Sequence, residues 1–314
     1  MRKFIAAVFA VAFTASAALA QSQQAPTLRI VSEDGNRLPS ELMYGNTKVK
    51  PLRLRPGTNI PITIDDSDFF VQQHYVDFLS RFPDQSGFSF WQNDIEQCGS
   101  SVQCREVHRI NVSAAFFLSI EYQRSSYLVY KTYKAAFGDL PGKPVPVRRE
   151  NLMPDTRTIL NGIVVGTDPN WEAKFNANIN AYEQAFVQRA DFQAAFPSTM
   201  TAQQFVDKLF SNAGVTPTNG ERNDAIALFN STGGRAAALR SVAESNTLHQ
   251  AELNKAFVLS QYFGYLKRNP DDLPDANFSG YSFWLGKLNE FSGDFVRAEM
   301  VKAFISSSEY RTRF

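Results

Sequence analysis

One segment occurs twice in this chain. It first reads FVQQHYVDFLSRFPDQSGFSFW at residues 70–91. It returns as FVLSQYFGYLKRNPDD at residues 257–272 and, after the six-residue insert LPDANF, as SGYSFW at residues 279–284. Without the insert, 12 of the 22 aligned positions are identical. Repetition of this kind is typical of folds built from a duplicated unit, so it constrains the architecture before any other feature does.

Each copy has the pattern of helix, turn and helix. In the first copy, apolar residues at helical spacing follow a run of capping residues at 65–68, and Pro83 ends that helix. Asp84 can cap the next helix. A third helix is expected at INVSAAFFLSIEY, which ends at Tyr122 and is matched by AFISSSEY, which ends at Tyr310. A more divergent version of the pattern follows Thr201, where Thr201 and Gln204 predict a capping box at the start of a helix.

We therefore predict a mainly α fold: an array of repeated three- to four-helix units, elongated or curved, with a short extended or β-like segment in front. The expected parts are a signal peptide at 1–20, an extended or small β-rich lead-in at 21–65, and helical units at 66–125, 126–200, 201–250 and 251–314. The first and last units are sharply defined, whereas the two middle ones are divergent.

The beginning of the chain predicts export. Arg2 and Lys3 precede an apolar stretch that is too short to span a bilayer comfortably, and Ala18-Leu19-Ala20 has the form of a cleavage site. We expect a secreted or periplasmic protein, cleaved near Ala20, with no transmembrane segment in the mature chain. Removal of Arg2 and Lys3 lowers the formal net charge from +1 to −1, which argues against nucleic acid as a partner.

The two cysteines, Cys98 and Cys104, lie in the segment CGSSVQC. In an oxidising compartment two cysteines at this spacing are expected to form a disulfide. The other interpretations are a redox pair or part of a metal site. Redox motifs favour C-x-x-C, and a metal site would need two further ligands.

The most specific string is the recurring turn. Its residues are Arg81, Pro83, Asp84, Gly87 and Trp91 in the first copy and Arg268, Pro270, Asp271, Gly280 and Trp284 in the second. We interpret it as a structural clasp. The arginine is expected to bind helix-end carbonyls and the aspartate of its turn, the glycine to allow close packing, and the tryptophan to join the core.

With Phe90 before Trp91, the first copy carries the signature R-x-P-D-x-x-G-x-x-[FY]-W, between an aromatic helix and an Ala/Phe-rich helix that ends in Glu-Tyr. In this arrangement, residues 69–123 resemble the bacterial family called domain of unknown function 4214. Residues 255–314 resemble it less closely because of the insert, and residues 21–65 lie outside the resemblance. The resemblance implies an all-helical module of exported or surface-associated proteins. Since no activity is established for that family, it implies no catalytic residues.

Motifs of catalysis are not apparent in the sequence. The three histidines have no metal-site spacing, and we predict no catalytic, cofactor or metal residues. Glu121 and Glu309 recur before a tyrosine, and each is either a catalytic carboxylate or a helix-end hydrogen-bond acceptor. The acidic loop 271–277 could hold calcium, although it lacks EF-hand spacing and is more typical of a solvated loop.

The leading functional hypothesis is an exported, non-enzymatic module for protein interaction, or for scaffolding or adhesion at the cell envelope, with an unknown protein or surface polymer as partner. Repeat arrays offer extended surfaces of the kind that such a role needs. The alternative is a carbohydrate-binding or hydrolytic protein that uses a cleft between units, with Glu121, Glu309 and aromatic residues in it.

Overall fold

The computed structural model describes residues 28–32, 39–44, 47–49, 53–166 and 168–314. This part of the chain is mainly α-helical, as the sequence predicts. The expected signal peptide lies outside the described residues. None of the described helices is long and apolar enough to cross a membrane.

Three short strands lie within the stretch that was expected to be extended or β-rich. They are β1 (Leu28–Ser32), β2 (Pro39–Tyr44) and β3 (Thr47–Val49). They form one antiparallel sheet in the order β1-β2-β3, in which Leu42 lies opposite both Ile30 and Val49. A single bridge between Leu54 and Pro61 follows before the first helix.

The first helical stretch has the element order that the capping residues predict. It contains α1 (Ser67–Leu79), α2 (Gln85–Glu96), α3 (Val102–Leu118) and α4 (Ile120–Gln123). The Asp84 side chain accepts a hydrogen bond from the Gly87 amide at the start of α2, and Ser101 does the same for Cys104 at the start of α3. These caps supply acceptors for amides that have no partner within the helix.

The middle of the chain is a run of helices between residues 126 and 243. It contains α5 (Ser126–Phe137), α6 (Arg149–Leu160), α7 (Trp171–Phe186), α8 (Ala190–Ala195), α9 (Ala202–Ala213), α10 (Asn219–Phe229) and α11 (Gly234–Ala243). The capping box of Thr201 and Gln204 is confirmed at the start of α9. A second one, formed by Thr218 and Glu221, starts α10.

The last stretch contains α12 (Asn246–Gln261), a π-helical continuation η1 (Tyr262–Leu266), α13 (Ser279–Glu290), α14 (Met300–Ser306) and α15 (Ser308–Arg311). The boundary expected between residues 250 and 251 lies inside α12. The Ser245 side chain caps this helix by accepting a hydrogen bond from the Leu248 amide.

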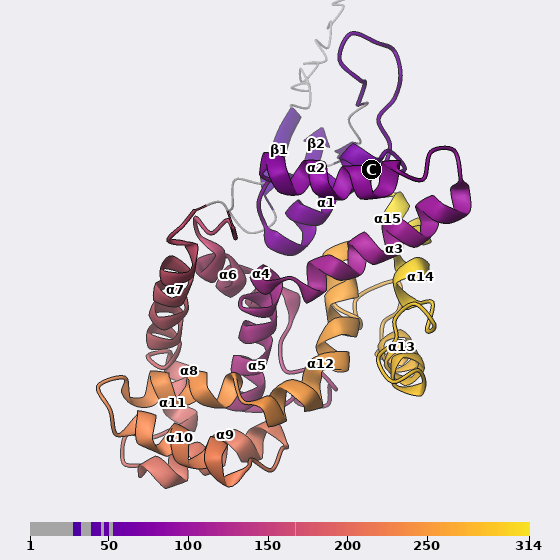
Figure 1. Ribbon diagram of the computed structural model, residues 1–314. Helices are drawn as coiled ribbons and strands as arrows, with labels where there is room; N and C mark the ends of the chain where they lie inside the picture. Colours follow the sequence, from indigo (N-terminus) through magenta and orange to yellow (C-terminus); the bar gives the residue numbers. More distant parts are fainter. Residues whose placement is uncertain (1–27, 33–38, 45–46, 50–52, 167) are drawn as a thin grey trace, which may run out of the picture.

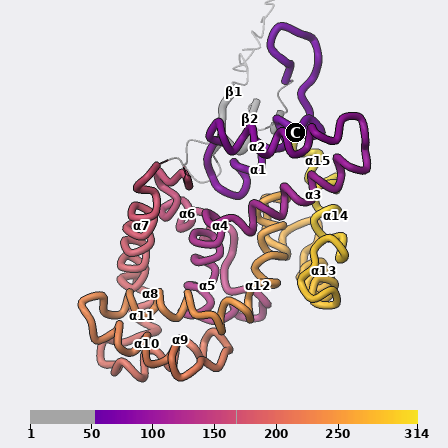
Figure 2. The backbone as a smooth tube through the Cα atoms, in the orientation of Figure 1, coloured from indigo at the N-terminus to yellow at the C-terminus, as the bar shows by residue number. Residues whose placement is uncertain are grey.

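The first and last helical stretches lie side by side at one end of the molecule, and the middle helices form the other end (Figures 1 and 2). In a linear array the middle units would separate them. Instead, Phe78 of α1 contacts Tyr265 of η1, with ring centroids 5.0 Å apart, and these two residues occupy matching positions of the two copies. The C-terminal Phe314 packs edge-on against Phe69.

Helices α5 and α12 run between the two ends and pack against each other. The Tyr127 hydroxyl donates to the His249 carbonyl at 2.7 Å, and the Tyr130 hydroxyl donates to Glu252 at 2.6 Å. The core continues through this junction from one end to the other, with aromatic stacks such as Phe117 on Phe257. Phenylalanine accounts for 27 of the 314 residues, and several of these side chains take part in such aromatic core contacts.

Candidate functional site

The recurring arginine of the first copy binds the recurring glutamate. Arg81 donates from Nε and Nη2 to the two carboxylate oxygens of Glu121, both at 2.8 Å. Its Nη1 donates to the Phe82 carbonyl at 3.1 Å and lies 3.4 Å from Asp84. The guanidinium also lies over the Tyr75 ring. Both oxygens of Glu121 are thus engaged in a two-point pair, which is the strong form of an arginine–carboxylate contact.

The second copy repeats this contact with a different aspartate. Arg268 pairs with Glu309 at 2.6 and 3.1 Å and lies over the Tyr262 ring. The aspartate that it binds is Asp275, at 2.8 Å. The expected pairing of Arg268 with Asp271 is therefore wrong: the extra residues extend the turn, and Asp275 takes the place that Asp84 has in the first copy.

Asp271 faces a different part of the molecule. It pairs with Lys143 and with Arg148, and Arg148 also binds Asp272 at 2.8 Å. Both cations belong to the connection between α5 and α6. The carboxylates of the acidic loop are thus matched by cations, and a calcium ion there would have to displace Lys143, Arg148 or Arg268.

The glycine of each turn makes the close approach that the sequence predicts. A Cβ atom on Gly87 would lie 2.2 Å from the Tyr75 hydroxyl, and one on Gly280 would lie 2.6 Å from the Tyr262 hydroxyl. Real Cβ atoms do not come so close to another heavy atom, so a side chain at either position would push the tyrosine away.

The tryptophans of the two turns are partly buried against the core. Trp91 lies against Phe116 and Trp284 against Phe304, with centroid distances of 6.1 and 5.9 Å. Apart from the aspartate, the contacts of these motif residues therefore agree between the two copies. They place the motif's arginine, glutamate, glycine and tryptophan in packing roles.

The phenylalanine before each tryptophan is exposed. Phe90 is 63% exposed and Phe283 is 55% exposed, and each ring packs edge-on against its neighbouring tryptophan. We call these two residues the paired phenylalanines. Sequence reasoning included Phe90 in the signature but gave it no surface role. The sequence carried no clear signal of this exposure, because consecutive helical residues can both be buried, as Phe116 and Phe117 are.

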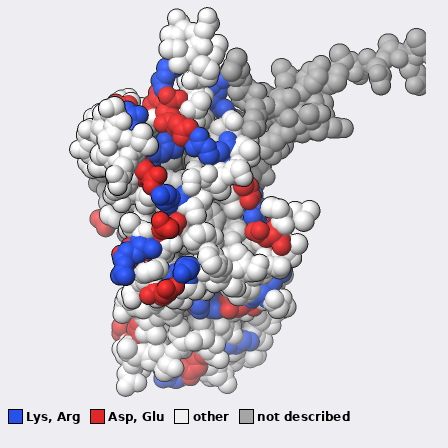
Figure 3. Space-filling model, turned by 90° about the vertical axis from the view of Figure 1, so that its right-hand side faces the viewer, with Lys and Arg blue, Asp and Glu red and all other residues white. Residues whose placement is uncertain are grey.

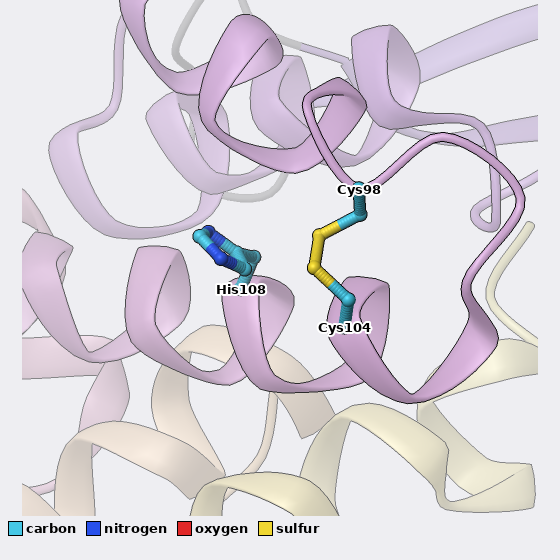
Figure 4. Close-up of side chains that lie close together, drawn as sticks. All are labelled: Cys98, Cys104 and His108. Atoms are coloured by element: carbon cyan, nitrogen blue, oxygen red, sulfur yellow. A yellow bond between two sulfur atoms is a disulfide. The ribbon is translucent and has the colours of Figure 1, made fainter.

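The predicted disulfide between Cys98 and Cys104 is present and joins the end of α2 to the start of α3 (Figure 4). His108 lies beside it, one helical turn after Cys104. Its Nδ1 atom is 2.9 Å from Asp94 of α2. The sequence did not indicate that His108 would lie so close to the cysteines, because no recognised metal-site spacing links these residues.

His74 is a buried residue of the junction between the two copies. Its ring nitrogens lie 2.8 Å from the Phe70 carbonyl, 2.9 Å from the Ser113 hydroxyl and 3.2 Å from the Tyr265 hydroxyl. Burial lowers the pKa of His74 to about 4, so it is neutral at physiological pH. Its counterpart in the second copy is Gln261, which is also buried.

A buried charge cluster, which sequence reasoning missed, joins the same two stretches. Asp77 accepts two hydrogen bonds from Arg313, both at 2.9 Å, and lies 3.0 Å from the Lys267 amino group. Burial alone would raise the pKa of Asp77, but the charges of Arg313 and Lys267 lower it. The repeat does not indicate this cluster, because neither charged residue recurs in the other copy. The position of Asp77 is occupied there by Gly264, and the position of Lys267 by Ser80.

A pocket of about 620 Å³ lies at the far end of the molecule, between the α7–α8 turn and the start of α11. Amides, hydroxyls and backbone groups dominate its lining, together with Phe196 and Arg235. Arg235 is engaged, since it donates to the carbonyls of Phe196 and Pro197. The described residues that line the pocket include no carboxylate, and neither Glu121 nor Glu309 is among them.

No family model, no curated protein and no solved structure matches this chain.

Proposed function

We propose that this protein is an exported, non-enzymatic helical module that binds another protein or a surface polymer of the cell envelope. The observation that carries the proposal is the pair of exposed phenylalanines, Phe90 and Phe283, at one motif position in both copies. The resemblance of the motif to the family called domain of unknown function 4214 points the same way.

The paired phenylalanines are suited to recognition. An aromatic side chain offers a large apolar contact area and loses little conformational freedom when it is covered. Each of the two rings is already oriented by its contact with Trp91 or Trp284. A partner therefore meets a surface that is formed in advance.

The polar groups of the motif support binding rather than catalysis. Glu121 and Glu309 are each paired at both oxygens with an arginine. A general acid or base must exchange a proton with substrate, and here that would require breaking a two-point ion pair. On the face drawn in Figure 3, basic and acidic side chains alternate, which suits contact through apolar groups better than long-range attraction of a charged ligand.

We further propose that the two copies are duplicated units that have diverged where they meet. Phe78 and Tyr265 are counterparts that contact each other. Asp77 and Gly264 are also counterparts, and they differ because Asp77 faces Lys267 whereas Gly264 lies against the Phe78 ring. The middle units would then have lost the motif because they do not form this junction.

The test compares exposed phenylalanines of similar accessibility. Phe82 is 58% exposed, but its counterpart, Asn269, is polar, so Phe82→Ser is a matched control for the double variant Phe90→Ser/Phe283→Ser. The chain 21–314 is immobilised and exposed to envelope extract from its source, and retained protein and glycan are quantified.

We expect one principal component to be retained by the parent chain and by the Phe82→Ser variant, and to be lost with the double variant. Equal retention by all three would refute a role for the paired phenylalanines. Circular dichroism melting of the three chains shows that any loss is not due to unfolding.

The alternative, a carbohydrate-binding or hydrolytic protein, gains support for binding from the pocket at the α7–α8 turn. Its amide groups, such as those of Gln188 and Gln193, suit the hydroxyls of a sugar. Because its described lining includes no carboxylate, this pocket favours binding over hydrolysis. Titration with cell-wall oligosaccharides, followed by calorimetry, separates the alternatives: binding that Gln188→Ala weakens and Phe90→Ser leaves unchanged would favour the pocket.

A further inference from the structure

We propose that Cys98, Cys104 and His108 form a site for a thiolate-binding divalent metal ion such as zinc when the disulfide is reduced. The disulfide is then the closed form of the site, and reduction opens it. This inference does not depend on the function proposed above, since it concerns the loop between α2 and α3.

The three side chains are already gathered. The two sulfur atoms and a ring nitrogen of His108 all lie within 4.8 Å of one another, and each residue is partly buried (Figure 4). Cys104 and His108 are four residues apart on α3, so they lie on the same face of that helix. Cys98 reaches them from the end of α2.

The backbone spacing allows the change from disulfide to metal site. Zinc–sulfur bonds of about 2.3 Å in a tetrahedral site place two sulfur atoms about 3.8 Å apart. The Cα atoms of Cys98 and Cys104 are 5.5 Å apart, so rotation of the two side chains can produce that separation without a large backbone movement. The site then has two sulfur ligands and one nitrogen ligand.

Asp94 orients the histidine as in known metal sites. The Nδ1 atom of His108 lies 2.9 Å from a carboxylate oxygen of Asp94, and in the neutral ring it donates its proton there. The Nε2 atom then carries the lone pair that a metal ion needs. A carboxylate behind a metal-binding histidine fixes its tautomer and ring orientation, and its loss lowers metal affinity about 10–100-fold.

The described residues supply three ligands, so the fourth position of a tetrahedral ion would be left to water. This is the ligand number of zinc sites with an open position, in contrast to closed structural sites. Asp94 is a positioning residue here, because its carboxylate is used by His108.

The redox step is a two-electron reduction. A phosphine reductant attacks one sulfur atom and breaks the S–S bond. Water then supplies the oxygen of the phosphine oxide and the two protons of the thiols. The phosphine is oxidised, Cys98 and Cys104 are reduced, and binding of the divalent ion displaces the two thiol protons to solvent.

The test uses cobalt(II) as a spectroscopic probe for the whole chain 21–314. Cobalt is titrated with and without the phosphine, and the thiolate-to-cobalt charge-transfer absorption is recorded together with the visible ligand-field bands. Three variants accompany the parent: His108→Ala, Asp94→Asn, and His249→Ala as a matched control, since His249 is a partly buried histidine away from the cysteines. Circular dichroism shows whether each reduced chain remains folded.

We expect one equivalent of cobalt to bind to the reduced parent and to the His249→Ala variant, and none to bind to the oxidised chain. His108→Ala should weaken binding at least 10-fold, and Asp94→Asn should weaken it about 10–100-fold. The proposal is overturned if the folded, reduced parent shows no thiolate–cobalt absorption. It is also overturned if His108→Ala binds cobalt as tightly as the parent does, because the thiols alone would then explain the binding.

Discussion

The buried carboxyl group of Glu183 allows a quantitative test of how the stability of this protein depends on pH. The side chain is 1% exposed, and its Oε1 accepts a hydrogen bond from the Thr132 hydroxyl at 2.8 Å. Among the described residues, its Oε2 has no hydrogen-bond partner. Burial raises the pKa of Glu183 to about 8. The carboxyl group is therefore protonated in the folded protein at neutral pH, whereas it is ionised in the unfolded chain.

The sign of the effect follows from this difference. The folded state holds a proton that the unfolded state has released, so stability is complete below about pH 4.5 and is lost as the pH rises towards 8. One pKa unit corresponds to about 1.4 kcal/mol, so the loss between pH 5 and pH 8 is on the order of 3 kcal/mol. Glu183→Gln has a similar shape, keeps an acceptor for Thr132 and cannot ionise.

The assay is urea unfolding at pH 5 and at pH 8, followed by tryptophan fluorescence. We expect the free energy of unfolding of Glu183→Gln, relative to the parent, to rise by about 3 kcal/mol between the two pH values. Glu172→Gln is the matched control on the same helix, because Glu172 is exposed and should show no such rise. If parent and Glu183→Gln lose the same stability between pH 5 and pH 8, the assignment of a protonated Glu183 is refuted.

Three further substitutions, each followed by chemical unfolding, test the contact between the two copies and the disulfide. Asp77→Asn removes the buried carboxylate that two partly buried cations share, and we expect a loss of about 3 kcal/mol; a change below about 1 kcal/mol would show that the cluster is solvated. Gly264→Ala places a methyl group 2.6 Å from the Phe78 ring and should cost about 1–3 kcal/mol, whereas Gly286→Ala, in open space, should not. Cys98→Ser opens the short disulfide loop and should cost about 2 kcal/mol, a loss that reductant should reproduce in the parent.

Local features of this fold could be predicted from the sequence. Caps, turns and apolar spacing act over a few residues, so the sequence alone predicts the helices around Asp84, the capping box at Thr201 and the disulfide. The recurring arginine was predicted to be structural, and its contacts in both copies agree with that interpretation. The aspartate partner of Arg268 was assigned wrongly. Because the second copy has an insert in this loop, either Asp271 or Asp275 can be aligned with Asp84 of the first copy.

Contacts between distant segments could not be predicted in this way. The copies meet through residues that the repeat does not share, such as Asp77, Lys267 and Gly264, and a periodic pattern carries no information about such differences. The proximity of His108 to the cysteines likewise depends on how α2 and α3 cross. The exposure of Phe90 also depends on tertiary packing, because a helical residue next to a core residue such as Trp91 can be either buried or exposed.

The central claim is that the paired phenylalanines contact a partner. It is tested most directly by site-specific photo-crosslinking in the cells that produce the protein. A photoreactive phenylalanine analogue is placed at Phe90, at Phe283 or, as control, at Phe82. We predict the same crosslinked component from Phe90 and from Phe283, and none from Phe82. An equal yield from all three positions, or no product from the first two, would contradict the account.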